Sequence, residues 1–207
     1  MKKVLLLVMT LVSVQAFAQD ATPKNEIRFG RTIETTGYGA LTTQYSQFNG
    51  KDATFVGMYG GVMIDHRLMI GLGGFGMLNR PDGFNAVGNT DENREVQMGY
   101  GGVVIEYSFA GTKRIHLSGN VLAGGGGISN GYYATMSKNS GSQWYSTDES
   151  GFLVIQPSLN LEMNMTSWFR ISAGAGYRHI TGSNMNVLSD KDMSAPTANL
   201  TIKFGIF

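Results

Sequence analysis

The stretch that decides the fold runs from Phe152 to Asn164 and reads FLVIQPSLNLEMN. Its odd-numbered positions are mostly apolar and its even-numbered positions are mostly polar, with Val154 as the exception. Because successive side chains of a β-strand point to opposite faces, this period of two predicts a strand with one apolar and one polar face.

The same alternation recurs along most of the chain, so that the sequence predicts eight strands. Three further stretches alternate cleanly, and four are less regular. In chain order the seven are Thr36–Phe48, Phe55–Ile64, Leu68–Leu78, Val96–Phe109, Ile115–Gly124, Phe169–Arg178 and Asn199–Ile206. In Val96–Phe109 the apolar parity changes near Gly101 and Gly102, and a β-bulge there would explain it, since one extra residue turns the side chains to the other face.

The connections between these strands alternate in length. Three of them are short: Asp65–Arg67, Ala110–Arg114 and Met165–Ser167. Those on the other side are long, apart from Asn49–Asp52, and comprise Asn79–Arg94, Ser129–Ser150 and Gly182–Ser194. Short turns at one end and long loops at the other are typical of outer-membrane barrels, with the short turns and both chain ends on the periplasmic side.

The first eighteen residues have the pattern of a secretory signal peptide. Lys2 and Lys3 precede an apolar run, and Ala16-Phe17-Ala18 gives a small-x-small cleavage pattern. The run is too short for a membrane-spanning helix, which needs about 20 residues. We therefore expect a signal at 1–18, a short periplasmic segment at 19–32 and a barrel domain at 33–207.

Composition excludes several classes of protein. The chain has no cysteine, which leaves no thiolate metal site, no disulfide scaffold and no lipid-anchored N-terminus. Its 16 Lys and Arg stand against 15 Asp and Glu, and removal of Lys2 and Lys3 with the signal leaves a mature net charge of −1. A nucleic-acid-binding protein usually has an excess of basic residues, which this chain lacks.

Two arrangements would satisfy the alternation. The apolar face could form the core of a soluble exported ligand-binding barrel, or it could face lipid around a polar, filled lumen. The polar faces are rich in Ser, Asn, Gly and Thr, which favours a lumen. Aromatic residues near the strand ends suggest girdles at the two interfaces: Tyr107, Phe109, Trp168, Phe169 and Phe207 at one end, and Tyr45, Phe48, Phe55 and Tyr177 at the other. We predict an all-β, eight-stranded antiparallel up-and-down transmembrane β-barrel.

The chain resembles the small eight-stranded outer-membrane β-barrel family over nearly its whole mature length. The resemblance rests on the signal peptide, the alternation of short and long connections between strands, and the terminal segment Asn199–Phe207. The resemblance implies a place in the outer membrane of a Gram-negative bacterium. It also implies contact with outer-membrane lipid and lipopolysaccharide, and with the insertion machinery that reads a terminal aromatic such as Phe207. Phe207 departs from the pattern, because it falls on the face opposite Ile202, Phe204 and Ile206. Pro157 is a second departure; since a barrel has no free edge, it should lie at a bulge or an unpaired position.

Charged residues on the polar faces predict a structural network in the lumen. Turn centres at residues 166 and 111 would place Glu162 opposite Arg170 and Glu106 opposite His116, and opposite charges across a strand pair attract. The expected network consists of Glu106, His116, Glu162, Arg170, Arg178 and Lys203. An eight-stranded barrel is filled by side chains, so a plug is favoured over a proton or ion path.

Other motifs carry weaker signals. Gly71–Gly76 matches the GxGxxG pattern but lies inside a strand, so we expect no cofactor. His179 and Ser183 at the outer rim leave open a lipid A deacylase-like enzyme, although the His-x-Ser-Asn spacing of such enzymes is absent. The leading hypothesis is a non-enzymatic barrel with a structural or surface-interaction role. In that role an unidentified ligand would meet four aromatics of the Ser129–Ser150 loop: Tyr132, Tyr133, Trp144 and Tyr145.

Overall fold

The computed structural model describes residues 34–48, 50–79, 81–84, 90–111, 113–137, 140–186 and 188–207. The predicted signal at 1–18 and the segment at 19–32 lie outside the described residues. None of the helices in these ranges is long and apolar enough to cross a membrane.

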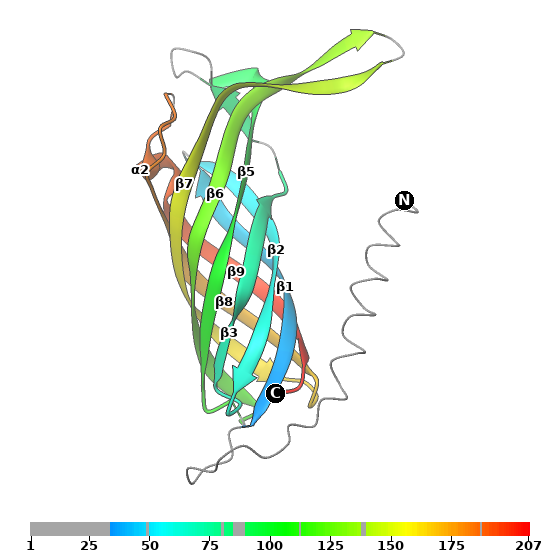
Figure 1. The fold of residues 1–207 in the computed structure, drawn as a ribbon, viewed down its shortest axis with the longest axis vertical. Helices are drawn as coiled ribbons and strands as arrows, with labels where there is room; N and C mark the ends of the chain where they lie inside the picture. The colour runs from blue at the N-terminus through cyan, green and yellow to red at the C-terminus, as the bar shows by residue number, and fades with distance from the viewer. Residues whose placement is uncertain are drawn as a thin grey trace, which may run out of the picture. The chain divides into compact units, whose positions relative to one another are not determined.

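Eight antiparallel strands form a closed ring, as the sequence predicted (Figure 1). Each strand of the ring pairs with its neighbour in the chain, and the pairing of β1 with β9 closes it. The ring consists of β1 (Thr35–Phe48), β2 (Lys51–Ile64), β3 (Leu68–Met77), β5 (Thr90–Phe109), β6 (Ile115–Ser137), β7 (Ser140–Asn164), β8 (Phe169–Thr181) and β9 (Ala195–Gly205).

The long connections contain more structure than the sequence indicated. Asn79–Arg94 includes the short strand β4 (Asp82–Phe84), which pairs with β5. Gly182–Ser194 includes the helix α2 (Asp190–Met193), with Met193 fully buried. Ser129–Ser150 is not a loop, because β6 and β7 continue through it as a paired hairpin that projects beyond the ring (Figure 1).

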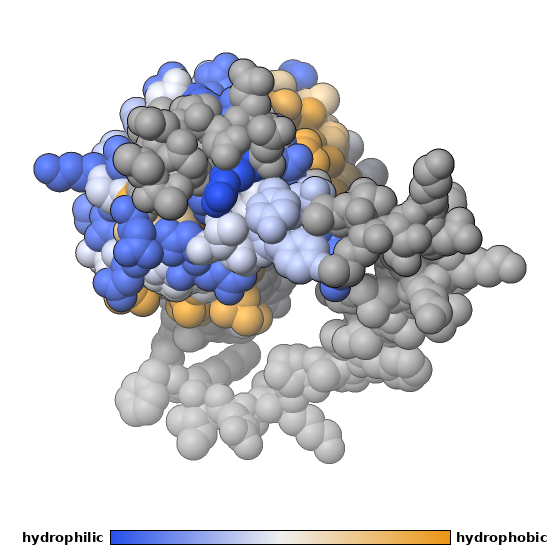
Figure 2. All heavy atoms as spheres, turned by 90° about the horizontal axis from the view of Figure 1, so that it is seen from above, coloured by the Kyte–Doolittle hydropathy of each residue, from blue (hydrophilic) through white to orange (hydrophobic). Residues whose placement is uncertain are grey.

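The apolar faces lie on the outside of the ring. Large apolar side chains along the strands are about half exposed, among them Leu159, Leu161 and Leu200. Their polar neighbours Asn160, Glu162 and Thr201 are buried inside. Seen from the end that carries α2, the molecule is mostly hydrophilic at that end and hydrophobic along its flanks (Figure 2). A soluble barrel would have the opposite pattern, so this alternative from the sequence is wrong.

The predicted bulge at Gly101 and Gly102 does not exist. Both residues keep a regular register with β3 and with β6. Even-numbered side chains of β5 point into the lumen along its length, from Val96 and Met98 to Glu106 and Ser108. The apolar parity changes because the lumen itself changes, from apolar near the hairpin end to polar near the short turns.

Because the lumen is apolar near the hairpin end, part of the predicted aromatic girdles is wrong. Phe48 and Phe55 are at most 1% exposed and point inward, whereas Tyr45 and Tyr177 are about half exposed on the outer wall, at 49% and 46%. Phe207 packs on Tyr38 with ring centroids 5.3 Å apart, at the end of the lumen where the short turns lie. Phe207 lies two residues beyond the end of β9 and keeps the parity of the inward-facing odd positions of that strand, such as Thr201 and Lys203.

The predicted unpaired position of Pro157 is found on its β8 side only, since Pro157 pairs with Val121 on its β6 side. On the β8 side, pairing stops after Ile155–His179 and resumes at Ser158–Gly176 with the register unchanged. Proline has no backbone N–H to donate, so the missing partner on the β8 side leaves no backbone donor of Pro157 unsatisfied.

Candidate functional site

A group of charged side chains fills the lumen near the short turns. Lys203 on β9 lies between two carboxylates: its Nζ donates to Glu106 Oε1 at 2.6 Å and also to Glu162 Oε1. All three side chains are at most 1% exposed. A buried charge is tolerated only when it is paired and hydrogen-bonded, so these residues act on the barrel as one unit.

Four further side chains contact the oxygens of the two carboxylates. Tyr38 and Tyr59 donate their hydroxyls to Glu106, at 2.6 and 3.3 Å. On Glu162, the Ser118 hydroxyl donates to Oε1 at 2.5 Å and His116 Nε2 lies 3.2 Å from Oε2. Sequence reasoning missed both tyrosines, although the parity of their strands placed them on the inner face.

Arg170 reaches this group diagonally, not from the predicted facing position. The β7–β8 register pairs Glu162 with Ser172 and Arg170 with Asn164, so the turn is centred one residue later than predicted. Arg170 Nη1 still lies 3.7 Å from Glu162 Oε2, and its guanidinium stacks 3.9 Å from the Phe207 ring centroid.

The second predicted facing pair is also wrong. Glu106 opposes Asn120, and His116 opposes Glu162 on the next strand. The pairing of Glu106 with Asn120 centres the connection between β5 and β6 at residue 113, two residues later than predicted.

Arg178 lies apart from the other five residues of the expected network. It is eight residues from Arg170 on the same strand, which is roughly 26 Å at the usual rise. Its Nε donates to the carbonyl of Met193 at 3.1 Å and its Nη2 to that of Gln47 at 3.3 Å, while the guanidinium stacks on Phe55. Arg178 therefore ties α2 to the mouth of the barrel.

Between these two levels, three uncharged side chains close the lumen. Gln44 Nε2 donates to the Tyr100 hydroxyl at 3.0 Å, which donates to Gln156 Oε1 at 2.8 Å. Gln156 Nε2 completes the circuit at Gln44 Oε1, 2.7 Å away. Each of the three side chains is buried inside the ring.

The four aromatics singled out in the sequence lie on the projecting hairpin in two cross-strand pairs. Tyr132 stacks on Tyr145 with centroids 5.9 Å apart, and Tyr133 meets Trp144 edge-on at 5.0 Å. The two pairs occupy adjacent register positions, so they lie on opposite faces of the ribbon. At the hairpin's root Asn130 pairs with Asp148 but Gly131 with Ser146, and the extra residue Thr147 forms a bulge. A bulge bends the strand that contains it, which accounts for the bend in Figure 1.

The structure does not bring His179 and Ser183 together as a catalytic pair. His179 is exposed on the outer wall, and its imidazole makes no hydrogen bond within the described part of the chain. The backbone N–H of Ser183 donates to Asp190 Oδ1 at 3.0 Å, which directs that carboxylate to the loop backbone. No cluster of three or more metal-ligating side chains occurs among the described residues either.

Solved structures of other proteins share this architecture. Neisserial surface protein A matches with a TM-score of 0.51 and 9% identity, over 85% of this chain and 99% of that one. A major outer membrane protein from Thermus thermophilus matches with a TM-score of 0.51 and 10% identity, over 82% and 99%. The chain has the fold of the small eight-stranded outer-membrane β-barrels. No protein-family model and no curated protein sequence matches it.

Proposed function

We propose that this barrel is a non-enzymatic protein of a Gram-negative outer membrane that meets partners at the cell surface through the β6–β7 hairpin. The observation that carries the proposal is the hairpin itself, which presents aromatics on both faces beyond an otherwise closed ring. Aromatic side chains supply a large contact area with two rotatable bonds each, which suits recognition.

The outer membrane is favoured by the half-exposed apolar wall and by the likeness of the fold to outer-membrane barrels. In this position lipid and lipopolysaccharide surround the wall, and the insertion machinery reads the terminal strand β9. His179 and Ser183 make no hydrogen bond to each other, which supports a role other than lipid hydrolysis.

Trypsin added to intact cells tests this proposal. In the sequence Lys138 directly follows Ser137, the last residue of β6, and Lys113 and Arg114 belong to the short connection between β5 and β6. We expect cleavage after Lys138 and protection of the short turn, which is cut only after the outer membrane is opened. Cleavage at Lys113 and Arg114 in intact cells would overturn the orientation, and recovery of the protein in the soluble periplasmic fraction would overturn the location.

A further inference from the structure

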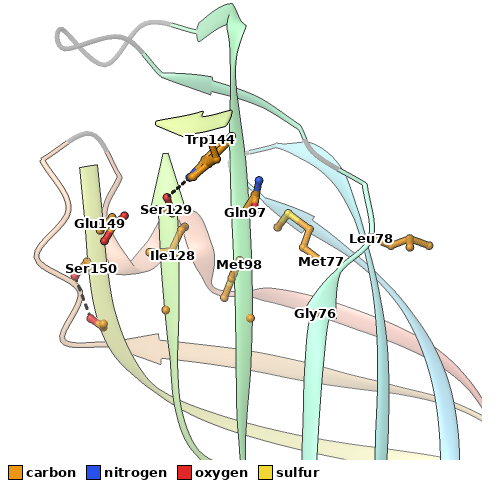
Figure 3. A pocket seen from close by; sticks show the side chains of 13 residues that line it. Gly76, Met77, Leu78, Gln97, Met98, Ile128, Ser129, Trp144, Glu149 and Ser150 are labelled. Carbon is orange, nitrogen blue, oxygen red and sulfur yellow. Dashed lines mark hydrogen bonds between the residues drawn. The ribbon is translucent and has the colours of Figure 1, made fainter. Parts of the chain in front are cut away.

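A groove of about 1070 Å³ lies on the outer wall of the barrel at the root of the hairpin (Figure 3). Its floor consists of four glycines that are direct cross-strand neighbours on β3, β5, β6 and β7: Gly76, Gly99, Gly127 and Gly151. They share the parity of the exposed residues Leu72, Val103, Val121 and Leu153 on the same strands, which places them on the outer face.

Folding of the barrel does not require glycine at these positions. A Cβ added at Gly76 would meet nothing within 4 Å, and at Gly127 only the Ser150 carbonyl at 4.0 Å. The nearest atoms to a Cβ at Gly99 and Gly151 would be 3.5 and 3.8 Å away, which is ordinary contact. Their backbone lies within extended strands. The glycines therefore leave space that larger side chains could fill.

The bent hairpin covers the upper end of this groove. Ser129, Gly131 and Tyr133 continue the outer face of β6, so Trp144, paired with Tyr133, lies on the same side as the glycine floor. Trp144 Nε1 donates to Ser129 Oγ at 3.3 Å, and Gln97 Nε2 donates to the Tyr133 hydroxyl at 3.2 Å. These two hydrogen bonds hold Trp144 and Tyr133 against the outer wall of the barrel.

The polar side chains that line the groove are either acidic or uncharged. Glu149 lines it and is exposed, with no hydrogen bond or ion pair to any described residue. Gln97 and Ser129 contribute an amide and a hydroxyl, and no lysine or arginine occurs among the described lining residues. An uncompensated carboxylate repels a phosphate, whereas it accepts hydrogen bonds from sugar hydroxyls.

We propose that the groove binds a neutral glycolipid of the outer leaflet. This inference rests on the proposed outer-membrane position and adds a ligand class to it. The acyl chain continues from the apolar wall at Val103 and Leu153 onto the glycine floor. The sugar packs against Trp144, an aromatic with one polar edge of the kind found at headgroup level. Glu149 and the free oxygen of Gln97 accept hydrogen bonds from the sugar hydroxyls.

Fluorescence quenching of Trp144 by brominated lipids tests the proposal. Trp168→Phe leaves Trp144 as the single tryptophan. The full-length mature barrel is placed in phosphatidylcholine vesicles that contain equal fractions of monoglucosyl diacylglycerol, phosphatidylcholine or phosphatidylglycerol with brominated acyl chains. We expect the strongest quenching from the glycolipid and the weakest from anionic phosphatidylglycerol.

Gly127→Leu and, independently, Gly76→Leu should abolish the difference between glycolipid and phosphatidylcholine, because the side chain fills the floor. Gly39→Leu is the matched control, since Gly39 is also outward-facing on β1 with nothing within 4 Å of an added Cβ. Heat-modifiability on a gel verifies folding of each variant. Equal quenching by all three lipids, or a preference that survives in both floor variants, would overturn the glycolipid site. Either result would leave the proposed function standing if trypsin cuts intact cells at Lys138.

Discussion

At the scale of single residues, Lys203 has the largest structural role in the lumen. It lies between Glu106 and Glu162. These two carboxylates also accept hydrogen bonds from the hydroxyls of Tyr38, Tyr59 and Ser118, and Glu162 contacts His116. Without the ammonium group, two buried anions would face each other with only Arg170 nearby. The arrangement explains why polar side chains can fill a barrel whose outer face is apolar.

Lys203→Met should therefore destabilise the barrel by about 3–5 kcal/mol, the usual cost of removing one partner from a buried pair. The triple variant Glu106→Gln, Glu162→Gln and Lys203→Met should recover part of this loss, because neither carboxylate is then left charged without Lys203. The recovery is only partial, because Arg170 loses its ion pair with Glu162. Urea unfolding in lipid vesicles measures both.

Lys51→Met is the control, since the ion pair of Lys51 with Asp82 is partly exposed and worth about 0–1 kcal/mol. Equal losses for Lys51→Met and Lys203→Met would show that burial of the Lys203 pairs has no energetic consequence.

At the scale of elements, the sequence predicted which stretches form ring strands but not how far they extend. Alternation predicts the strand Phe152–Asn164 with one exception at Val154, whereas Ser129–Ser150 is rich in Gly, Ser and Asn, a composition that favours a loop. Its strands are held by cross-strand aromatic pairs, Tyr132 with Tyr145 and Tyr133 with Trp144, and periodicity within one strand does not reveal such pairs. Register was the second limit, since a turn centre displaced by one residue moves the facing partner of Glu162 from Arg170 to Ser172.

The hairpin should be separable from the barrel. Gly131 and Ser146 face each other at its root, so replacing residues 132–145 by an Asn-Gly turn closes the chain with a standard two-residue connection. We expect the truncated protein to remain heat-modifiable, with an unfolding free energy within about 1 kcal/mol of the parent, because the lumen groups do not contact the hairpin. A truncated chain that fails to fold in vesicles would show that the hairpin is part of the folding unit.

At the scale of the whole molecule, the ring has an apolar outer wall and a lumen closed at three levels. The Lys203 group closes the end near the short turns, the triangle of Gln44, Tyr100 and Gln156 closes the middle, and Arg178 with α2 closes the mouth. The sequence predicted five of the six charged residues in one place. Arg178 differs because eight residues of β8 separate it from Arg170, which is roughly 26 Å along the strand.

Purified protein in planar bilayers should therefore show no large, steady conductance. Eight strands enclose only enough space for side chains, and the buried groups occupy it. Triple substitution of Gln44, Tyr100 and Gln156 by alanine should not open a porin-like pore either, because the charged group below remains. A reproducible porin-like conductance from the parent protein would contradict the filled lumen.

The most direct test of the account is a spin-label scan along β7 and β9 in lipid vesicles. The absence of cysteine allows single-cysteine variants without a background. At Leu159, Leu161, Leu200 and Ile202 the label should be accessible to oxygen and shielded from a water-soluble nickel complex, whereas labels at Asn160 and Thr201 should be shielded from both. Access of the nickel complex to the apolar positions, with oxygen access no higher there than at their polar neighbours, would contradict a lipid-facing wall around a filled lumen.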